Sequence, residues 1–115
     1  MTHDEQEDHD IADARAALAS IGAMIGDLCG GKTPVQIDGV FQGAQFYFRS
    51  RGSHWRIWIG PGAHVLRDAD LYEEAEYRPE GVSDEDARYI AGYMPLAEAL
   101  GLVRTSLERW AGLRA

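Results

Sequence analysis

Residues 26–33 form a pattern that could bind phosphate. Their sequence, Gly-Asp-Leu-Cys-Gly-Gly-Lys-Thr, matches the phosphate-loop pattern G-x-x-x-x-G-K-[ST] at every fixed position. That chemistry needs a strand before the loop and a helix after it, so that backbone N–H groups and the helix dipole face the phosphates. Here the preceding residues have helical periodicity, and residues 34–39 favour a strand and a turn. We therefore interpret the match as chance similarity, and we predict no cofactor.

The charged residues of the stretch 68–86 are all acidic except Arg78. Their carboxylates could hold a hard cation such as Ca²⁺ or Mg²⁺. The EF-hand pattern fails, because Tyr72 stands where the third ligand belongs and Glu73 where the turn glycine belongs. We predict no metal site. Two interpretations remain: a solvated acidic face, or a docking surface whose carboxylates fill a basic groove on a partner protein. The residues of this predicted acidic surface are Asp68, Asp70, Glu73, Glu74, Glu76 and Glu80.

Two histidines, His54 and His64, are candidates for metal ligands or a general base. Neither has a metal-ligand spacing with Cys29, and single scattered residues indicate no Ser–His–Asp arrangement. We predict no catalytic residues and expect that the protein is not an enzyme.

The segment 32–67 is basic and aromatic, with Asp38 as its single acid. Tryptophan, tyrosine and arginine are the residue types most often found as interface hot spots, and they also suit single-stranded nucleic acid. The alternative is that the last helices or the acidic segment cover these residues as an internal layer of ion pairs. The predicted sheet-face residues are Tyr47, Arg49, Arg51, Arg56 and Trp58.

The elements that must position these residues begin with an N-terminal helix. Residues 1–9 are acidic and without periodicity, which predicts a disordered arm. Asp10 is a plausible N-cap for a helix over 10–29, which Gly30-Gly31 would end. Its apolar positions are spaced 3-4-3-4-3, so the helix either lies on a sheet or forms a homodimer seam. The seam residues are Ile11, Ala14, Leu18, Ile21, Ile25 and Leu28.

An antiparallel meander is predicted over residues 33–60. Asp38-Gly39 predicts a two-residue hairpin turn, and Gly43 predicts a bulge in the strand that follows. A second turn centred on Arg51-Gly52 would pair Phe48 with Trp55 on an apolar face, and Tyr47 with Arg56 on a polar face.

The C-terminal third is predicted to be mainly helical. Residues 63–67 could add a short fourth strand, and residues 68–76 favour a loop and then a short helix. Ser83 and Asp86 form a capping box for a helix that stops near Gly92, and Pro95 suits the start of a last helix. The apolar stripe of that helix is Leu96, Leu100, Val103, Leu107 and Trp110. Residues 10–115 are thus expected to form one α+β domain, in which an N-terminal helix and two C-terminal helices accompany a three- to four-stranded antiparallel meander, the C-terminal pair packed on one sheet face.

Bulk composition narrows the class of partner. The chain has 115 residues and a net charge of −8, which disfavours nonspecific binding to nucleic acid or an anionic membrane. It has one cysteine, and neither a leader nor an apolar run long enough to cross a membrane is evident, so a cytoplasmic protein is expected. All basic residues except Lys32 are arginine, which we interpret as a sign of a GC-rich bacterial or phage genome.

These observations favour a small acidic inhibitor or adaptor that binds a protein with a basic surface. One version is an anti-defence protein of the anti-CRISPR type, whose carboxylates mimic nucleic acid. An immunity protein or a secretion chaperone is a second version. A single-stranded nucleic-acid binder that uses the aromatic and arginine face is the alternative from a different class.

Overall fold

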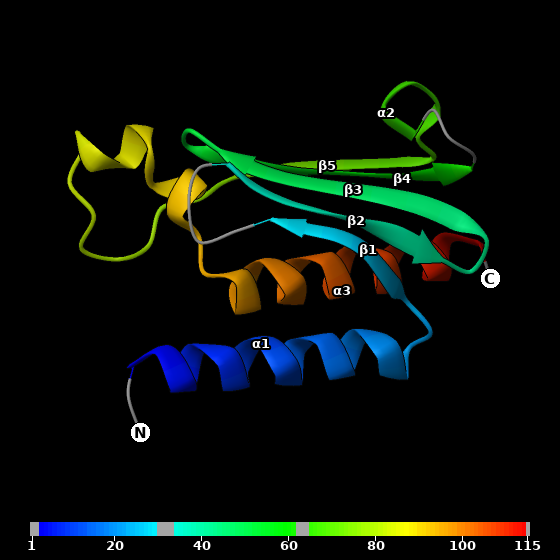
Figure 1. The fold of residues 1–115 in the computed structure, drawn as a ribbon. Helices are drawn as coiled ribbons and strands as arrows, with labels where there is room; N and C mark the ends of the chain where they lie inside the picture. The colour runs from blue at the N-terminus through cyan, green and yellow to red at the C-terminus, as the bar shows by residue number, and fades with distance from the viewer. Residues whose placement is uncertain (1–2, 30–33, 62–64, 115) are drawn as a thin grey trace.

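A five-stranded antiparallel sheet with the strand order β1-β2-β3-β4-β5 organises the molecule (Figure 1). The computed structural model describes residues 3–29, 34–61 and 65–114. The strands are β1 (Met24–Cys29), β2 (Val35–Phe41), β3 (Ala44–Arg51), β4 (His54–Pro61) and β5 (Leu71–Glu76). The helices are α1 (His3–Ser20), α2 (Val65–Asp68) and α3 (Leu96–Arg114), with the 3₁₀ turns η1 (Asp86–Arg88) and η2 (Ile90–Tyr93) before α3. The predicted α+β class is confirmed, with a meander of five strands.

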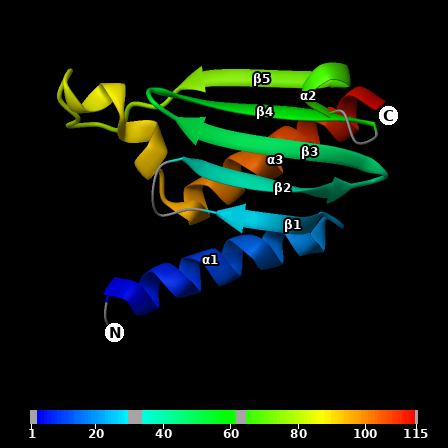
Figure 2. The same ribbon diagram turned by 45° about the horizontal axis from the view of Figure 1, so that its top comes forward.

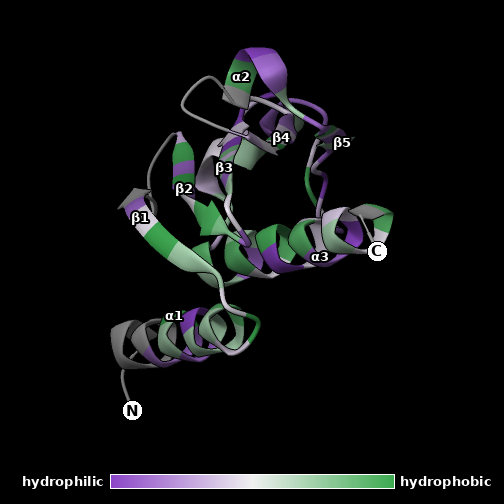
Figure 3. Cartoon of the chain, turned by 90° about the vertical axis from the view of Figure 1, so that its right-hand side faces the viewer, coloured by the Kyte–Doolittle hydropathy of each residue, from purple (hydrophilic) through white to green (hydrophobic). Residues whose placement is uncertain are grey.

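The two long helices lie on the same side of the sheet (Figures 1 and 2). Helix α3 packs under the strands, and α1 packs against α3 on the side of β1 (Figure 3). Between the helices and the sheet lies one hydrophobic core, in which the largest fully buried side chains include Trp110, Phe46, Phe48, Leu18 and Ile57. Within the described ranges, no helix has the length and apolar content that crossing a membrane requires.

The helix predicted over 10–29 is in fact a helix and a strand. Helix α1 begins at His3, so it includes most of the segment predicted to be a disordered arm, and it ends at Ser20. Gly22 follows at φ +86°, and the Ala23 N–H donates to the Leu18 carbonyl at 3.0 Å, as in a helix C-cap. Residues 24–29 then form β1, so the predicted continuous helical seam does not form.

The Asp38-Gly39 turn prediction is also wrong, because β2 runs straight through both residues. Gly39 pairs with Phe46 of β3, and a Cβ atom at Gly39 would stand 2.2 Å from the Met24 carbonyl oxygen of β1. Glycine is needed here for a close approach rather than for a turn. The hairpin turn lies at Gln42-Gly43, at φ +50° and +79°, so Gly43 forms the turn and not a bulge.

The second hairpin differs from its predicted register by two residues. Its turn is at Gly52-Ser53, which places Tyr47 opposite Trp58 and Phe48 opposite Ile57. Because side chains alternate with period two, a shift of two residues changes the partners but keeps every side chain on its predicted face. The predicted division into apolar and polar faces is therefore confirmed, although the pairs are not.

The acidic segment extends the sheet. Residues 65–68 form α2 and residues 71–76 form β5, in place of the predicted short strand followed by a loop and a helix; positions 63 and 64 lie outside the described residues. The predicted helix from Ser83 to Gly92 is replaced by η1 and η2. The Asp86 N–H donates to the Ser83 hydroxyl at 3.2 Å, which is one of the two bonds of the predicted capping box. A single long C-terminal helix, α3, therefore stands where two were expected, with its predicted stripe buried from Leu100 to Trp110.

Candidate functional site

The predicted sheet-face residues all lie on the face of the sheet opposite α1 and α3, which we call the open face. Tyr47, Arg49 and Arg51 alternate along β3, and Arg56 and Trp58 alternate along β4. Neither alternative for covering them holds in the described part of the chain. Helix α3 packs on the other face, and the acidic segment joins β4 as an edge strand instead of folding over it (Figure 1).

A row of three aromatic rings crosses the open face. Tyr47, Trp58 and Tyr72 occupy directly opposed positions on β3, β4 and β5. The ring centroids are 5.7 Å apart for Tyr47 and Trp58 and 5.2 Å apart for Trp58 and Tyr72, with tilts of 46° in both pairs. Sequence reasoning missed Tyr72 because it assigned residues 68–76 to a loop and a helix. The alternation that indicates a strand is weak in residues 71–76, because Glu73 falls in the row of Leu71 and Ala75.

Arginines occupy the row beside the aromatic rings. Arg49 stands directly opposite Arg56, which stands opposite Glu74. Glu74 accepts from both neighbours: its Oε1 accepts from the Arg56 Nη2 at 3.5 Å, and its Oε2 accepts from the Tyr72 hydroxyl at 2.5 Å. The same Oε2 forms an ion pair with the Arg56 Nε at 3.4 Å. Like charges opposed across two strands repel each other, and Glu74 compensates the charge of Arg56 alone. The Nε of Arg49 is buried without a hydrogen-bond partner among the described residues.

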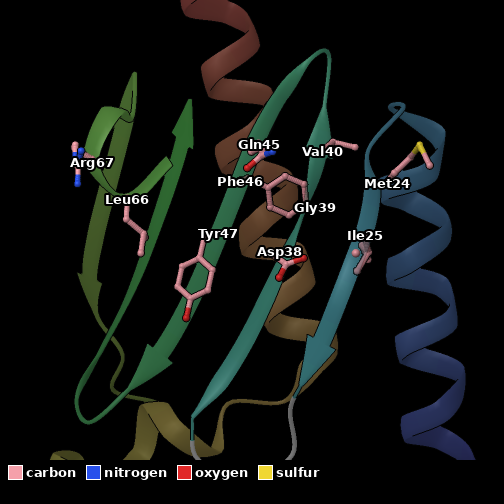
Figure 4. Close-up of a pocket in the computed structure, with 11 residues that line it drawn as sticks. Met24, Ile25, Asp38, Gly39, Val40, Gln45, Phe46, Tyr47, Leu66 and Arg67 are labelled. Carbon is pink, nitrogen blue, oxygen red and sulfur yellow. The ribbon is translucent and has the colours of Figure 1, made fainter. Parts of the chain in front are cut away.

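Two hollows flank the aromatic row. The first, the apolar groove, has a volume of about 810 Å³ and lies over β1–β3 next to α2 (Figure 4). Its rim includes Met24, Val40 and Leu66, whose side chains are 68%, 42% and 61% exposed. The second, the cationic pocket, has a volume of about 430 Å³ and lies at the β3–β4 turn. It is lined by Arg49, Arg51, Gly52, Ser53, His54, Arg56, Trp58 and Arg88. The open face thus has one half that exposes apolar side chains beside Asp38, Gln45 and Arg67, and another half whose charged lining is all cationic.

The predicted acidic surface is divided between two faces of the sheet. Glu73 points to the helix side of β5 and forms an ion pair with Arg109 of α3, whereas Glu74 and Glu76 point to the open face. Asp68 and Asp70 precede β5 and Glu80 follows it, so these exposed carboxylates lie toward opposite ends of the strand. The structure therefore does not gather the six carboxylates on one surface.

The other chemical candidates find little support in the fold. Residues 30–33 of the phosphate-loop pattern lie outside the described residues; the element before them is a strand, but the element after them is β2, antiparallel to β1, and not a helix. His64 also lies outside the described residues. Where residues are described, no group of three or more His, Cys, Asp or Glu side chains is placed to hold a metal ion.

The carboxyl of Glu74 has a perturbed pKa, which allows a direct test of this geometry. The hydrogen bond from Tyr72, and then the charge of Arg56, hold the pKa of Glu74 below its ordinary value. The change Tyr72→Phe removes the larger effect, so we expect the pKa of Glu74 to rise toward that ordinary value in a pH titration followed by carboxyl ¹³C NMR. Tyr89→Phe, at an exposed tyrosine that does not contact Glu74, serves as the control. An unchanged pKa in Tyr72→Phe would show that the hydroxyl does not bond to Glu74.

No protein-family model, curated protein or solved structure matches this chain.

Proposed function

We propose that this is a non-catalytic binding protein that holds an extended segment of a partner protein on its open face. The observation that carries the proposal is the aromatic row Tyr47–Trp58–Tyr72, which lies between an apolar groove and a cationic pocket on a face that the long helices leave uncovered. Tryptophan, tyrosine and arginine dominate the binding energy of protein interfaces when they are grouped at the centre of a patch.

The two halves of the open face define the chemistry of the partner segment. Met24, Val40 and Leu66 expose apolar surface that an aliphatic or aromatic side chain would cover. The charged residues that line the cationic pocket are all basic, although the whole chain has a net charge of −8. Charge complementarity therefore favours a segment with apolar residues at one end and acidic residues at the other.

The proposed functions that rely on the acidic surface have less support than peptide binding on the open face. An inhibitor of the anti-CRISPR type that mimics nucleic acid needs its carboxylates on one surface, and β5 divides them between two faces. An immunity protein or a secretion chaperone binds protein as well, and either role is compatible with a peptide-binding open face.

Single-stranded nucleic acid is the competing occupant, because rings beside arginines suit stacked bases and phosphates. Two observations favour a protein segment instead. The apolar groove has no counterpart in the chemistry of a nucleic-acid backbone, and the net charge of −8 repels a polyanion.

A selection from a random-peptide library tests the proposal. We expect the protein to enrich peptides that combine apolar and acidic residues, and to leave single-stranded DNA and RNA oligonucleotides unbound. The double variant Val40→Asp/Leu66→Asp places charge in the groove without altering the core. It should lower the affinity for the selected peptides by at least about tenfold. Leu113→Asp, the same kind of change on exposed α3 surface, is the matched control.

Two results would overturn the proposal. One is equal peptide affinity in the wild type and the groove variant. The other is a selection that enriches no peptide while an oligonucleotide binds in a salt-dependent manner and is lost on Arg56→Ala.

A further inference from the structure

We propose that the cationic pocket is a binding site for a phosphate monoester dianion. The pocket brings together Arg49 and Arg51 of β3, Arg56 of β4 and Arg88 of η1. It lies at one end of the open face, but the inference does not depend on the partner being a protein.

A contact between the β3–β4 turn and the 3₁₀ segment fixes the backbone near Arg51 and Arg88. The Ala91 N–H donates to the Gly52 carbonyl at 2.9 Å, and the Ser50 hydroxyl donates to the Ala91 carbonyl at 2.6 Å. Ser50 and Ala91 are both fully buried, so these hydrogen bonds are shielded from water. They bind η2 to the turn and thereby hold Arg88 of the adjoining η1 at the mouth of the pocket. Binding therefore orders little backbone, and the conformational entropy that it costs is mainly that of the arginine side chains.

The charges of the pocket are not balanced within the described part of the chain. Arg56 has an ion pair with Glu74, whereas Arg49, Arg51 and Arg88 have no ion pair among the described residues. Arg49 also faces Arg56 across the strands, with its own Nε buried and unbonded there. Crowded like charges raise the free energy of the folded state, and an anion in the pocket would relieve that repulsion.

A phosphate group balances the unpaired positive charge of these arginines better than a carboxylate does. A phosphate monoester carries a charge of about −1.5 to −2 at pH 7, whereas a carboxylate carries a single charge. Guanidinium groups pair with phosphate and with carboxylate through two parallel hydrogen bonds, so the larger charge is what favours phosphate. The volume of about 430 Å³ exceeds the space that a phosphate alone fills and lies within the range of about 300–1,000 Å³ for small-molecule sites. Trp58 lines the same pocket, so it can contact an aromatic group on the ester.

Titration with inorganic phosphate and with phenyl phosphate, followed by ¹H–¹⁵N NMR of the arginine Nε–H groups, tests the site on the full chain. Both ligands should produce saturable shifts at Arg49 and Arg51, and phenyl phosphate should bind more tightly because it also reaches Trp58. Sodium chloride at equal ionic strength should produce no saturable shift. The double variant Arg49→Gln/Arg51→Gln should lower the affinity for phenyl phosphate by at least about tenfold, since it removes two charge-assisted contacts.

Arg15→Gln/Arg104→Gln removes the same charge from positions outside both hollows and should bind phenyl phosphate as the wild type does. Thermal unfolding of each variant establishes that it is folded. The proposal is overturned if the double variant at Arg49 and Arg51 keeps full affinity, if neither phosphate gives saturable shifts, or if benzoate binds as tightly as phenyl phosphate. Because the peptide test alters the apolar groove and this test alters the cationic pocket, either proposal can fail while the other holds.

Discussion

Replacing Gly39 with alanine is expected to lower the free energy of unfolding by about 3 kcal/mol or more. The added Cβ would stand 2.2 Å from the Met24 carbonyl oxygen and 2.6 Å from the Cζ of Phe46. The carbonyl belongs to the backbone of β1 and the ring is fully buried, so neither can move without opening the β1–β2 ladder or the core. Urea unfolding followed by tryptophan fluorescence measures the loss.

Gly101→Ala is the matched control for this prediction. Gly101 is exposed in the interior of α3, and a Cβ there would have no atom within 4 Å. Alanine has a higher helix propensity than glycine, so this change should raise the free energy of unfolding by about 0.5–1 kcal/mol. A loss below about 1 kcal/mol in Gly39→Ala would contradict the close approach of β1 to β2 at this position, since the backbone preference for alanine, about 0.5–1 kcal/mol, offsets only a small part of such a clash.

The same glycine shows why local sequence signals misplaced the first hairpin. Asp-Gly is a strong turn signal in isolation, but the pairing of β2 with both of its neighbours outweighs it. Gly39 leaves room for the Phe46 ring across the strand, and the Asp38 carboxylate accepts a hydrogen bond from the Asp27 N–H at 2.9 Å. Both residues that suggested a turn thus serve contacts with partners distant in sequence, which no local pattern records.

The N-terminal helix was misjudged for a related reason. Ile11, Ala14 and Leu18 pack on the core as the helical spacing predicted. The spacing of Ile25 and Leu28 continues that helical period, yet both belong to β1, where a register irregularity separates their pairs with β2. A strand with an irregularity of this kind imitates a helical spacing over a few residues, so the end of α1 could not be placed from periodicity alone.

The face of the sheet on which the site residues lie was predicted more successfully than the elements that carry them. The side-chain alternation that assigned Tyr47, Arg49, Arg56 and Trp58 to one face survives a register error of two residues. The acidic run was harder, because charge alone carries no information about which way a side chain points. Only the placement of this run in β5 shows that Glu73 points to the helix side, where it pairs with Arg109, and that Glu74 points to the open face, where it pairs with Arg56.

Trp110→Ala is expected to lower the free energy of unfolding by about 3–5 kcal/mol, the range for removing a buried tryptophan. The side chain is 1% exposed, and its ring packs edge-on against Phe41 at a centroid distance of 6.0 Å. The cavity left by the indole would lie between α3 and the sheet, where buried neighbours on both sides limit its collapse. Urea unfolding, followed by far-ultraviolet circular dichroism because a fluorophore is lost, measures the change.

Leu113→Ala tests whether this loss reflects the packing face of α3 or the helix as a whole. Leu113 is 69% exposed on the same helix, so its truncation should change the free energy of unfolding by less than about 0.5 kcal/mol. Comparable losses at Trp110 and Leu113 would mean that α3 does not seat its buried stripe on the sheet. Because α3 packs on the helix side of the sheet, the contrast between these two variants also tests the arrangement in which the long helices leave the open face, with its aromatic row and arginines, uncovered.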